Sequence, residues 1–449
     1  MRRLILVLVL TTGCASTSEL PPMQPSVDLR GSWTLELTGP GESIPSLAGM
    51  VDDQRFAALV DRALAGNPDL VETSLRLRES GILLGVTRAR RLPLVDATLG
   101  QSRGNEAGGA RSPVSATSLG LDVSWEIDVW GRLADQVKEA ELRHRALDHD
   151  LRAAYSSLAA RTLQAGLERV LRGHQLDIER RRANSIESTL EVVRERYRSG
   201  LGTVTDWDAS RSELAASEAE IERLEEEVRR VDRDLSLLLG DLALEPGCLP
   251  EQLPEVRRSP VPVPADVLAT RPDVAAALSR LEADGVSVNV ARRALLPSFR
   301  LSSDLVLSSS SPGDLLKADP VWSLLGSLAA PLINRRALNA ELEASRVRAQ
   351  ASVAAYRGVL LDAVIEVEDA LGAEYSLSRR IPHLETSLEH AELSRRSFEG
   401  RFVRGLADIL DLLAAQRTAF ESELRLLEAR FDLLQNRIEL GLALGLRAV

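Results

Sequence analysis

The sequence predicts a mainly α-helical protein that also carries a small set of membrane β-strands. Three observations lead to this fold class: long stretches with helical apolar spacing, four shorter stretches of alternating apolar and polar residues, and an internal repeat. The chain has 449 residues, of which 44% are apolar and only 3% aromatic. Such a composition favours long helices over a large aromatic-rich core.

The chain begins with a secretory signal pattern of two arginines, an apolar run and small residues that end at Cys14. Gly13 and Cys14 resemble the lipobox of bacterial lipoproteins, in which the cysteine is acylated, although Thr11 departs from the usual aliphatic residue. We expect a signal peptide at residues 1–13, lipidation of Cys14 and a lipidated extension at residues 14–51. The alternative is an ordinary signal peptide with an incidental cysteine.

Two segments of the first half recur in the second half. The aligned pairs are residues 65–81 with 269–285 and residues 196–210 with 401–415. The second pair matches Gly200 with Gly405 and Asp206 with Asp411. A period of about 200 residues indicates a tandem duplication and not a short solenoid repeat.

The duplication predicts two structural repeats, at residues 52–243 and 265–445, joined by a proline-rich linker at residues 244–264. In each repeat, two strands precede a long helical hairpin. The expected strands are residues 94–106, 114–127, 298–310 and 321–333, and the expected hairpins are residues 130–240 and 334–444.

The helical segments show apolar residues at spacings of four and three from Leu133 onward, and no proline occurs between Pro113 and Pro246. The last helix carries two apolar seams, which begin at Leu412 and Leu413. Two seams imply neighbours on both flanks, as for a helix in the wall of a cylinder. A large water-soluble bundle would explain the helices but not the strands.

The strand candidates have one apolar and one polar face. In residues 114–127, for example, Leu119, Leu121 and Val123 point one way and Asp122 points the other. Such segments suit a membrane barrel with a wet interior, and a two-sided sheet in a soluble protein is the alternative. Four strands cannot close a barrel, and an open edge cannot lie in lipid, so several chains would have to share one barrel.

Composition and motifs argue against several other functions. The net charge of -11, with arginines interspersed among acidic residues, disfavours nucleic-acid binding. No phosphate-binding loop or nucleophile elbow occurs, so we expect no enzyme activity, no cofactor and no metal site. The histidines lack metal-ligand spacing; they are His144, His149, His174, His383 and His390. Only three methionines occur, which gives no support to a methionine-lined path for soft metal ions.

Several recognisable segments occur together with the duplication, the strand pairs and the lipobox. They are SWEIDVWGR (124–132), RPDVAAA (271–277), ARRALLPSFRL (291–301) and the two glycine-turn hairpins. In this combination the chain, from about Asp52 to Gly445, resembles the TolC-like outer-membrane efflux family, in its NodT-type lipoprotein branch. A periplasmic adaptor or scaffold with helical hairpins is the alternative function, but a duplicated hairpin preceded by membrane-type strands favours the channel.

The resemblance implies a homotrimer in which each chain gives four strands to a twelve-stranded barrel. It also implies a long periplasmic helical tunnel, and an equatorial belt that includes the linker and the segment around Pro382. Such a channel is passive, lies in outer-membrane lipid, and docks a periplasmic adaptor protein and an inner-membrane pump that supplies the energy.

The hairpin turns at Gly200 and Gly405 would then form the periplasmic tip, where acidic residues constrict the closed pore. Asp206 and Asp411, which follow these turns at equivalent positions of the two repeats, are therefore the candidate periplasmic gate. The alternative is that each is an ordinary helix-start aspartate, stabilised by the helix dipole.

Overall fold

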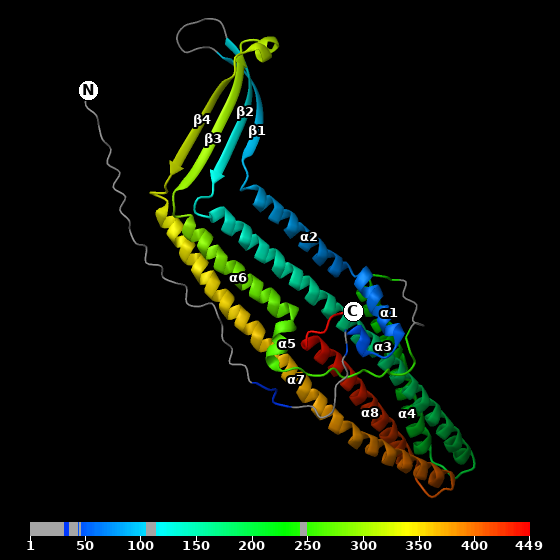
Figure 1. Ribbon diagram of the computed structural model, residues 1–449. Coiled ribbons are helices and arrows are strands. Elements are labelled where there is room, and N and C mark those ends of the chain that lie inside the picture. The colour runs from blue at the N-terminus through cyan, green and yellow to red at the C-terminus, as the bar shows by residue number, and fades with distance from the viewer. Residues whose placement is uncertain (1–30, 36–43, 45, 105–113, 243–248) are drawn as a thin grey trace, which may run out of the picture.

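The computed structural model describes residues 31–35, 44, 46–104, 114–242 and 249–449. Figure 1 shows an elongated molecule with a sheet at one end and long helices that run away from it. The first half contains η1 (Ala48–Met50), α1 (Gln54–Gly66), α2 (Pro68–Ala89), β1 (Leu94–Gly104), β2 (Val114–Ile127), α3 (Arg132–Arg198) and α4 (Val204–Leu239). The second half contains α5 (Pro264–Thr270), α6 (Pro272–Arg293), β3 (Ser298–Ser309), η3 (Pro312–Lys317), β4 (Val321–Ala329), α7 (Arg335–Val403) and α8 (Ile409–Ala443). The predicted fold class, mainly helical with four strands, is confirmed.

The four strands form one antiparallel sheet in the order β1-β2-β3-β4. The two halves of the chain join where β2 pairs with β3, with Leu121 opposite Leu305. The strand expected at residues 321–333 is shorter than predicted, because it ends at Ala329. Pro331, which has no N–H to donate, follows two residues later. One side of β1 and one side of β4 have no partner strand in the described part of the chain.

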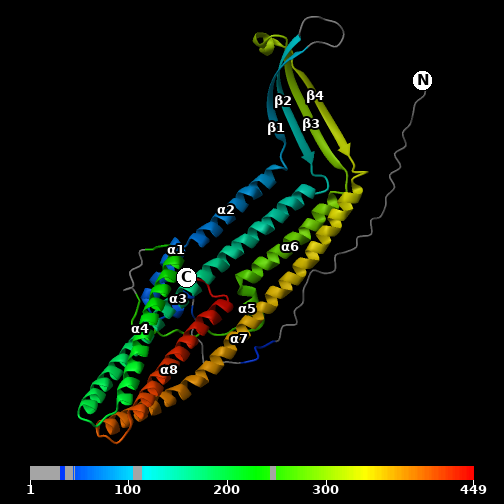
Figure 2. The ribbon, with the colours of Figure 1, turned by 180° about the vertical axis from the view of Figure 1, so that it is seen from behind.

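The two longest helices give the molecule its length. α3 has 67 residues and α7 has 69, so each extends about 100 Å at the usual helical rise. α7 passes through Pro382 as one helix, whereas the resemblance placed this segment in a belt of helix breaks. The proline removes one N–H from the helical ladder, but α7 stays continuous alongside α8 (Figure 2).

Two equivalent residues, Asn67 and Arg271, join the starts of α2 and α6 to the C-terminal ends of α4 and α8. Asn67 caps α2, and its side-chain amide donates to the carbonyl oxygen of Leu238 at 3.0 Å. Arg271 precedes α6 in the same way and donates to the carbonyl oxygen of Ala443 at 3.0 Å. The residue before each Pro-Asp pair therefore fixes the start of one helix to the end of another.

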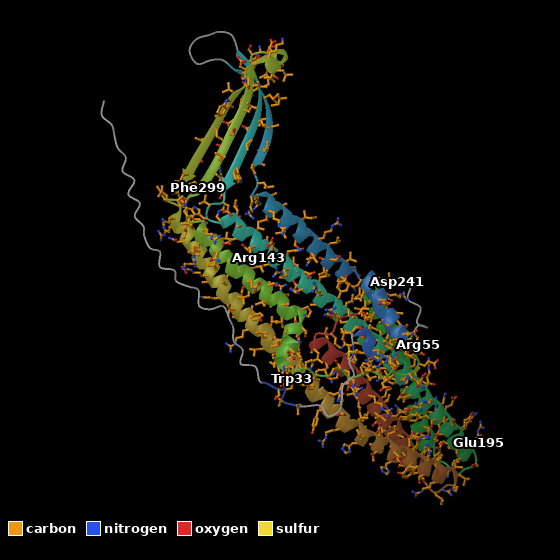
Figure 3. The ribbon with its side chains drawn as sticks, viewed as in Figure 1. Trp33, Arg55, Arg143, Glu195, Asp241 and Phe299 are labelled. Carbon is orange, nitrogen blue, oxygen red and sulfur yellow. The ribbon has the colours of Figure 1, made fainter. Side chains whose placement is uncertain are left out.

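The middle of the molecule holds its largest apolar core, which includes Phe56, Leu163 and Ile438. A second core contains Trp33, packed against Val267 and Leu371 among others. The Trp33 indole N–H donates to the Pro262 carbonyl oxygen at 2.6 Å, and Figure 3 shows the residue beside the middle of the long helices. The described N-terminal segment is thus attached far from the sheet.

Candidate functional site at the hairpin turns

The two hairpin turns lie together at the end of the molecule opposite the strands (Figure 2). Gly200 and Gly405 both adopt a φ of 74°, which is easily reached only by glycine. After each glycine, the next backbone N–H returns to the last turn of the preceding helix, from Leu201 to Arg196 and from Leu406 to Arg401, each at 2.8 Å. Both helices therefore end in the same hydrogen-bonded glycine motif.

Asp206 belongs to the N-terminal cap of α4. Its carboxylate accepts the backbone N–H of Thr203 at 2.8 Å, and its own N–H donates to the Thr203 hydroxyl at 3.2 Å. This reciprocal pair is a capping box, which satisfies two N–H groups at the helix start. The carboxylate of Asp206 is therefore engaged by its own helix.

Asp411 occupies the equivalent position of α8 but has different surroundings. Here the cap is Asp408, whose carboxylate accepts the N–H of Leu410 at 3.4 Å. The side chain of Asp411 is exposed, and it makes no hydrogen bond or ion pair with any residue that the structure describes. Of the two candidate gate residues, only Asp411 presents an unengaged carboxylate.

Three arginines close to the turns bind main-chain oxygens and not the candidate carboxylates. Arg196 donates to the carbonyl oxygen of Phe402 at 3.4 Å. Arg401 donates to that of Leu406 at 3.4 Å, and Arg404 to that of Gly400 at 2.9 Å. In the described part of this single chain, neither Asp206 nor Asp411 is paired with any of them.

At the turns, Arg196 of the first hairpin contacts Phe402 of the second. The guanidinium carbon of Arg196 lies 4.8 Å from the centre of the Phe402 ring, which is a cation–π distance. Phe402 is buried with Val193 and Ile409 in a small apolar cluster. A cavity of about 160 Å³ lies beside this contact, and its lining includes Arg196, Asp206 and Asp408.

A sequence model of the family described as "Outer membrane efflux protein" matches residues 59–241 and 263–446. The chain belongs to this family. Members of the family are transport channels and not enzymes, and this protein is accordingly an outer-membrane efflux protein.

Several relatives cover most of the chain. Outer membrane protein OprJ of Pseudomonas aeruginosa is 27% identical over 453 residues, covering 98% of this chain and 94% of OprJ. Cation efflux system protein CusC of Escherichia coli K12 is 25% identical, with coverage of 88% and 87%. The probable outer membrane lipoprotein SilC of Salmonella typhimurium is also 25% identical, with coverage of 88% and 86%.

Solved structures share the fold of this efflux protein. A crystal structure of CusC has a TM-score of 0.84 at 24% identity, over 95% of this chain and 98% of that one. The open state of the Neisseria gonorrhoeae MtrE outer membrane channel also has a TM-score of 0.84 at 24% identity, with coverage of 94% and 96%. The channel fold therefore extends over nearly the whole chain.

The contact between Arg196 and Phe402 was not predicted from the sequence of this efflux protein. The repeat did carry one signal, because it aligns Arg196 with Arg401 and aromatic Tyr197 with Phe402. Only the packing of the two hairpins shows that the arginine of the first repeat meets the aromatic ring of the second.

The remaining sequence-predicted features lie elsewhere. Cys14 is outside the described residues. His144 faces α2, where its Nδ1 lies 2.7 Å from the Ser80 hydroxyl. Within the described ranges, no group of three or more His, Cys, Asp or Glu side chains could hold a metal ion. No helix in the described part of the chain is long and apolar enough to cross a bilayer.

Proposed function

We propose that this chain is one subunit of a passive outer-membrane exit duct. Small molecules would enter it from an inner-membrane pump through a periplasmic adaptor protein. The observation that carries this proposal is the union, in one chain, of a four-stranded sheet with two open edges and two long hairpins that end at a common tip. The sheet suits a shared membrane barrel, and the hairpins suit the wall of a tunnel.

The open edges of the sheet support a homotrimer. β1 and β4 run in opposite directions, so β4 of one chain can pair with β1 of the next as an antiparallel neighbour. Three chains would then close a twelve-stranded barrel with no exposed edge. Apolar side chains on both edge strands are strongly exposed in the single chain, including Leu99 at 75% and Trp322 at 72%, as expected for a surface that meets lipid.

A tandem duplication would give this trimer a tunnel of six similar hairpins. Two copies of one unit are supported by the aligned segments. They are also supported by the equivalent hydrogen bonds from Asn67 to the end of α4 and from Arg271 to the end of α8. The proposed repeats are residues 52–243 and 265–445, with the linker at residues 244–264 between them.

The hairpin tips are the proposed periplasmic gate. In a trimer, Asp411 would supply three exposed carboxylates around the axis, and Asp206 three more that also cap their helices. Crowded carboxylates repel one another and attract cations. We therefore assign to Asp411 the larger share of the repulsion between chains and of the attraction for cations at the tip.

The cargo of the duct is set by its pump in this proposal. The relatives are named for chemically unlike cargo: pyoverdine for OpmQ of Pseudomonas aeruginosa, cations for CusC and solvents for SrpC of Pseudomonas putida. Such variety on one fold supports a duct that does not itself select the molecule.

Purification of the full chain in detergent tests the proposal. We expect light scattering to give the mass of three chains, and planar bilayers to show stable single-channel conductance. A monomer in detergent that forms no channel would contradict both the trimer and the duct. Crosslinking in cells, followed by mass spectrometry, should recover an adaptor and an inner-membrane pump.

A further inference from the structure

Two pairs of adjacent arginines lie where the helices meet the sheet. Arg90 and Arg91 follow the last turn of α2, and Arg335 and Arg336 begin α7. All four side chains are exposed, and none makes a hydrogen bond or ion pair with a residue in the described ranges. Each chain therefore carries four uncompensated positive charges at this level.

Four carboxylates near this level already have other partners: Asp128 accepts the backbone N–H groups of Leu133 and Ala134 at 3.1 and 2.8 Å, and the other three form ion pairs. The pairs are Glu126 with Arg132 at 2.6 Å, Glu141 with Arg88 at 2.7 Å and Asp135 with Arg293 at 2.9 Å. The start of α7 adds to the imbalance, because its first turn contains no acidic residue and Asn334 provides no side-chain cap. A helix N-terminus is itself positive, so Arg335 and Arg336 lie in a field that favours an anion.

Large apolar side chains stand directly beside both arginine pairs. Leu92 is 66% exposed, and Leu332 and Ile333 are 81% and 93% exposed. Water alone is a poor environment for three such side chains. Basic groups beside exposed aliphatic groups are typical of a segment at a membrane surface, where each kind of group meets its own layer of the bilayer.

Two tryptophans mark the same level of the molecule. The Trp125 indole N–H donates to the Arg91 carbonyl oxygen at 2.9 Å, and the Trp130 indole N–H donates to the Pro297 carbonyl oxygen at 2.6 Å. Trp130 also lies 6.3 Å from the ring of Phe299, which Figure 3 places at the base of the sheet. Tryptophan is enriched at the boundary between lipid and water.

We propose that the two arginine pairs form a binding surface for anionic phospholipids of the leaflet nearest the helices. The guanidinium groups donate hydrogen bonds to the phosphodiester, for which their planar geometry is suited. The lipid chains lie against Leu92, Leu332 and Ile333. This inference rests on the proposed function, because it requires the sheet to lie in a bilayer. In the closed trimer, Arg335 and Arg336 of one chain approach Arg90 and Arg91 of the next, so each seam of the barrel receives one such surface.

Trp125 and Trp130 provide the measurement. The full-length trimer, with Trp322→Phe to remove the tryptophan at the far end of β4, is reconstituted into mixtures of phosphatidylcholine and phosphatidylglycerol. Either lipid carries brominated chains that quench nearby tryptophan. We expect phosphatidylglycerol to bind about fivefold more tightly than phosphatidylcholine at low salt, and this preference to fall at 500 mM salt, because salt screens the attraction between the arginines and an anionic headgroup.

Two double variants and one control locate the effect. Arg90→Gln with Arg91→Gln, and Arg335→Gln with Arg336→Gln, should each bring the preference towards 1. The control, Arg379→Gln with Arg380→Gln, removes two charges from an exposed arginine pair in the middle of α7 and should leave the preference unchanged. If a glutamine variant does not form a trimer, the corresponding lysine variant replaces it, and its preference should be weaker than that of the wild type.

The outcomes separate this inference from the proposed function. An absence of quenching by either lipid would show that the sheet is not in the bilayer, and would overturn both. Quenching without a headgroup preference, or a preference that survives both double variants, would overturn only the lipid surface. A preference for phosphatidylglycerol that does not fall at 500 mM salt would show that the arginine charges do not produce it, and would also overturn the lipid surface.

Discussion

Arg196 of the first hairpin lies over the ring of Phe402 of the second, 4.8 Å from its centre, and also donates to the Phe402 carbonyl oxygen. This pair connects the two turns directly. Since the arginine reaches both the ring and the main chain of one residue, it restrains the position of the α7–α8 turn relative to α3.

Replacing Arg196 with alanine should loosen the α7–α8 turn. A cation–π contact is worth about 1 kcal/mol, so hydrogen exchange of residues 402–408 should accelerate about fivefold through local opening. Arg198→Ala is the matched control, because Arg198 pairs with exposed Glu195 at 3.0 Å and lies on the same turn. Equal exchange in both variants would show that the contact does not restrain the turn.

Removing the tip carboxylates should change the response of the channel to cations. The double change Asp206→Ala with Asp411→Ala should alter single-channel conductance and weaken block by multivalent cations from the periplasmic side. Asp411→Ala alone should weaken block about fivefold, on the order of 1 kcal/mol for a nearby charge in water. Asp206→Ala should chiefly lower stability, by about 1 kcal/mol for a lost cap.

Asp432→Ala is the control for this pair, because Asp432 is exposed on α8 away from the turn. If the correctly assembled double variant keeps its conductance and its cation block, both aspartates are ordinary helix-start residues.

The contact between Arg271 and Asp273 should make stability depend on pH. Burial works to raise the pKa of Asp273, but the hydrogen bonds and charge of Arg271 outweigh it and hold that pKa below its ordinary value of 3.8. With a lowered folded pKa, the stabilisation is present above the ordinary value and is lost as the pH falls through the lowered one.

Asp273→Asn should therefore lower the melting temperature of the trimer at pH 7, and the difference from the wild type should shrink below pH 3.8. The effect should stay near 1 kcal/mol, because the carboxylate is partly exposed and solvent screens it. Asp266→Asn, a change of an exposed aspartate on neighbouring α5, provides the comparison. A deficit that persists unchanged at acidic pH would rule out the ionised carboxylate as its source.

Trp33→Ala should detach the described N-terminal segment from the helices. The indole is only 9% exposed and packs against Val267 and Leu371, and a buried tryptophan contributes about 3–5 kcal/mol. We expect proteolysis near residues 31–35 to increase while the trimer remains assembled. Val263→Ala, at a half-exposed position within the linker, should leave the cleavage rate unchanged.

Cys14→Ser should abolish lipid labelling and impair processing of the signal peptide. Folding of the barrel should suffer less than anchoring, because one lipid modification adds an attachment and does not build the sheet. Intact-mass analysis of the mature wild-type chain checks this directly, and a chain cut elsewhere that carries no acyl groups would refute lipidation.

The regular elements were predictable because they depend on local patterns. Alternation of apolar and polar residues predicts the strands, and the repeated Gly200 and Gly405 predict both hairpin turns, where the structure gives each glycine a positive φ. The predicted strand extends to residue 333, because the apolar pattern continues to Ile333. β4 ends at Ala329, since Pro331 cannot donate a hydrogen bond to a neighbouring strand.

The contacts between distant segments were not predictable from such patterns. Asp206 and Asp411 occupy equivalent positions, yet only Asp206 has a cap partner, Thr203, with which it forms a reciprocal pair. Trp33 could not be placed either, because its partners are more than 200 residues away along the chain, as with the carbonyl oxygen of Pro262. Such partners are chosen by tertiary packing, which one sequence does not encode in a local period.

Because α7 is one continuous helix, a rotation at its middle would displace its C-terminal end. From Leu371, where the helix is held in the core around Trp33, α7 continues to Val403 at the turn, a length of roughly 48 Å at the helical rise. Pivoting this arm by only about 5° at the core would carry its far end roughly 4 Å, because displacement grows in proportion to the length of a rigid helix. A small adjustment of packing in the middle of the molecule would therefore be magnified at the turn, and bending at Pro382, which lies within the arm, would reduce this displacement.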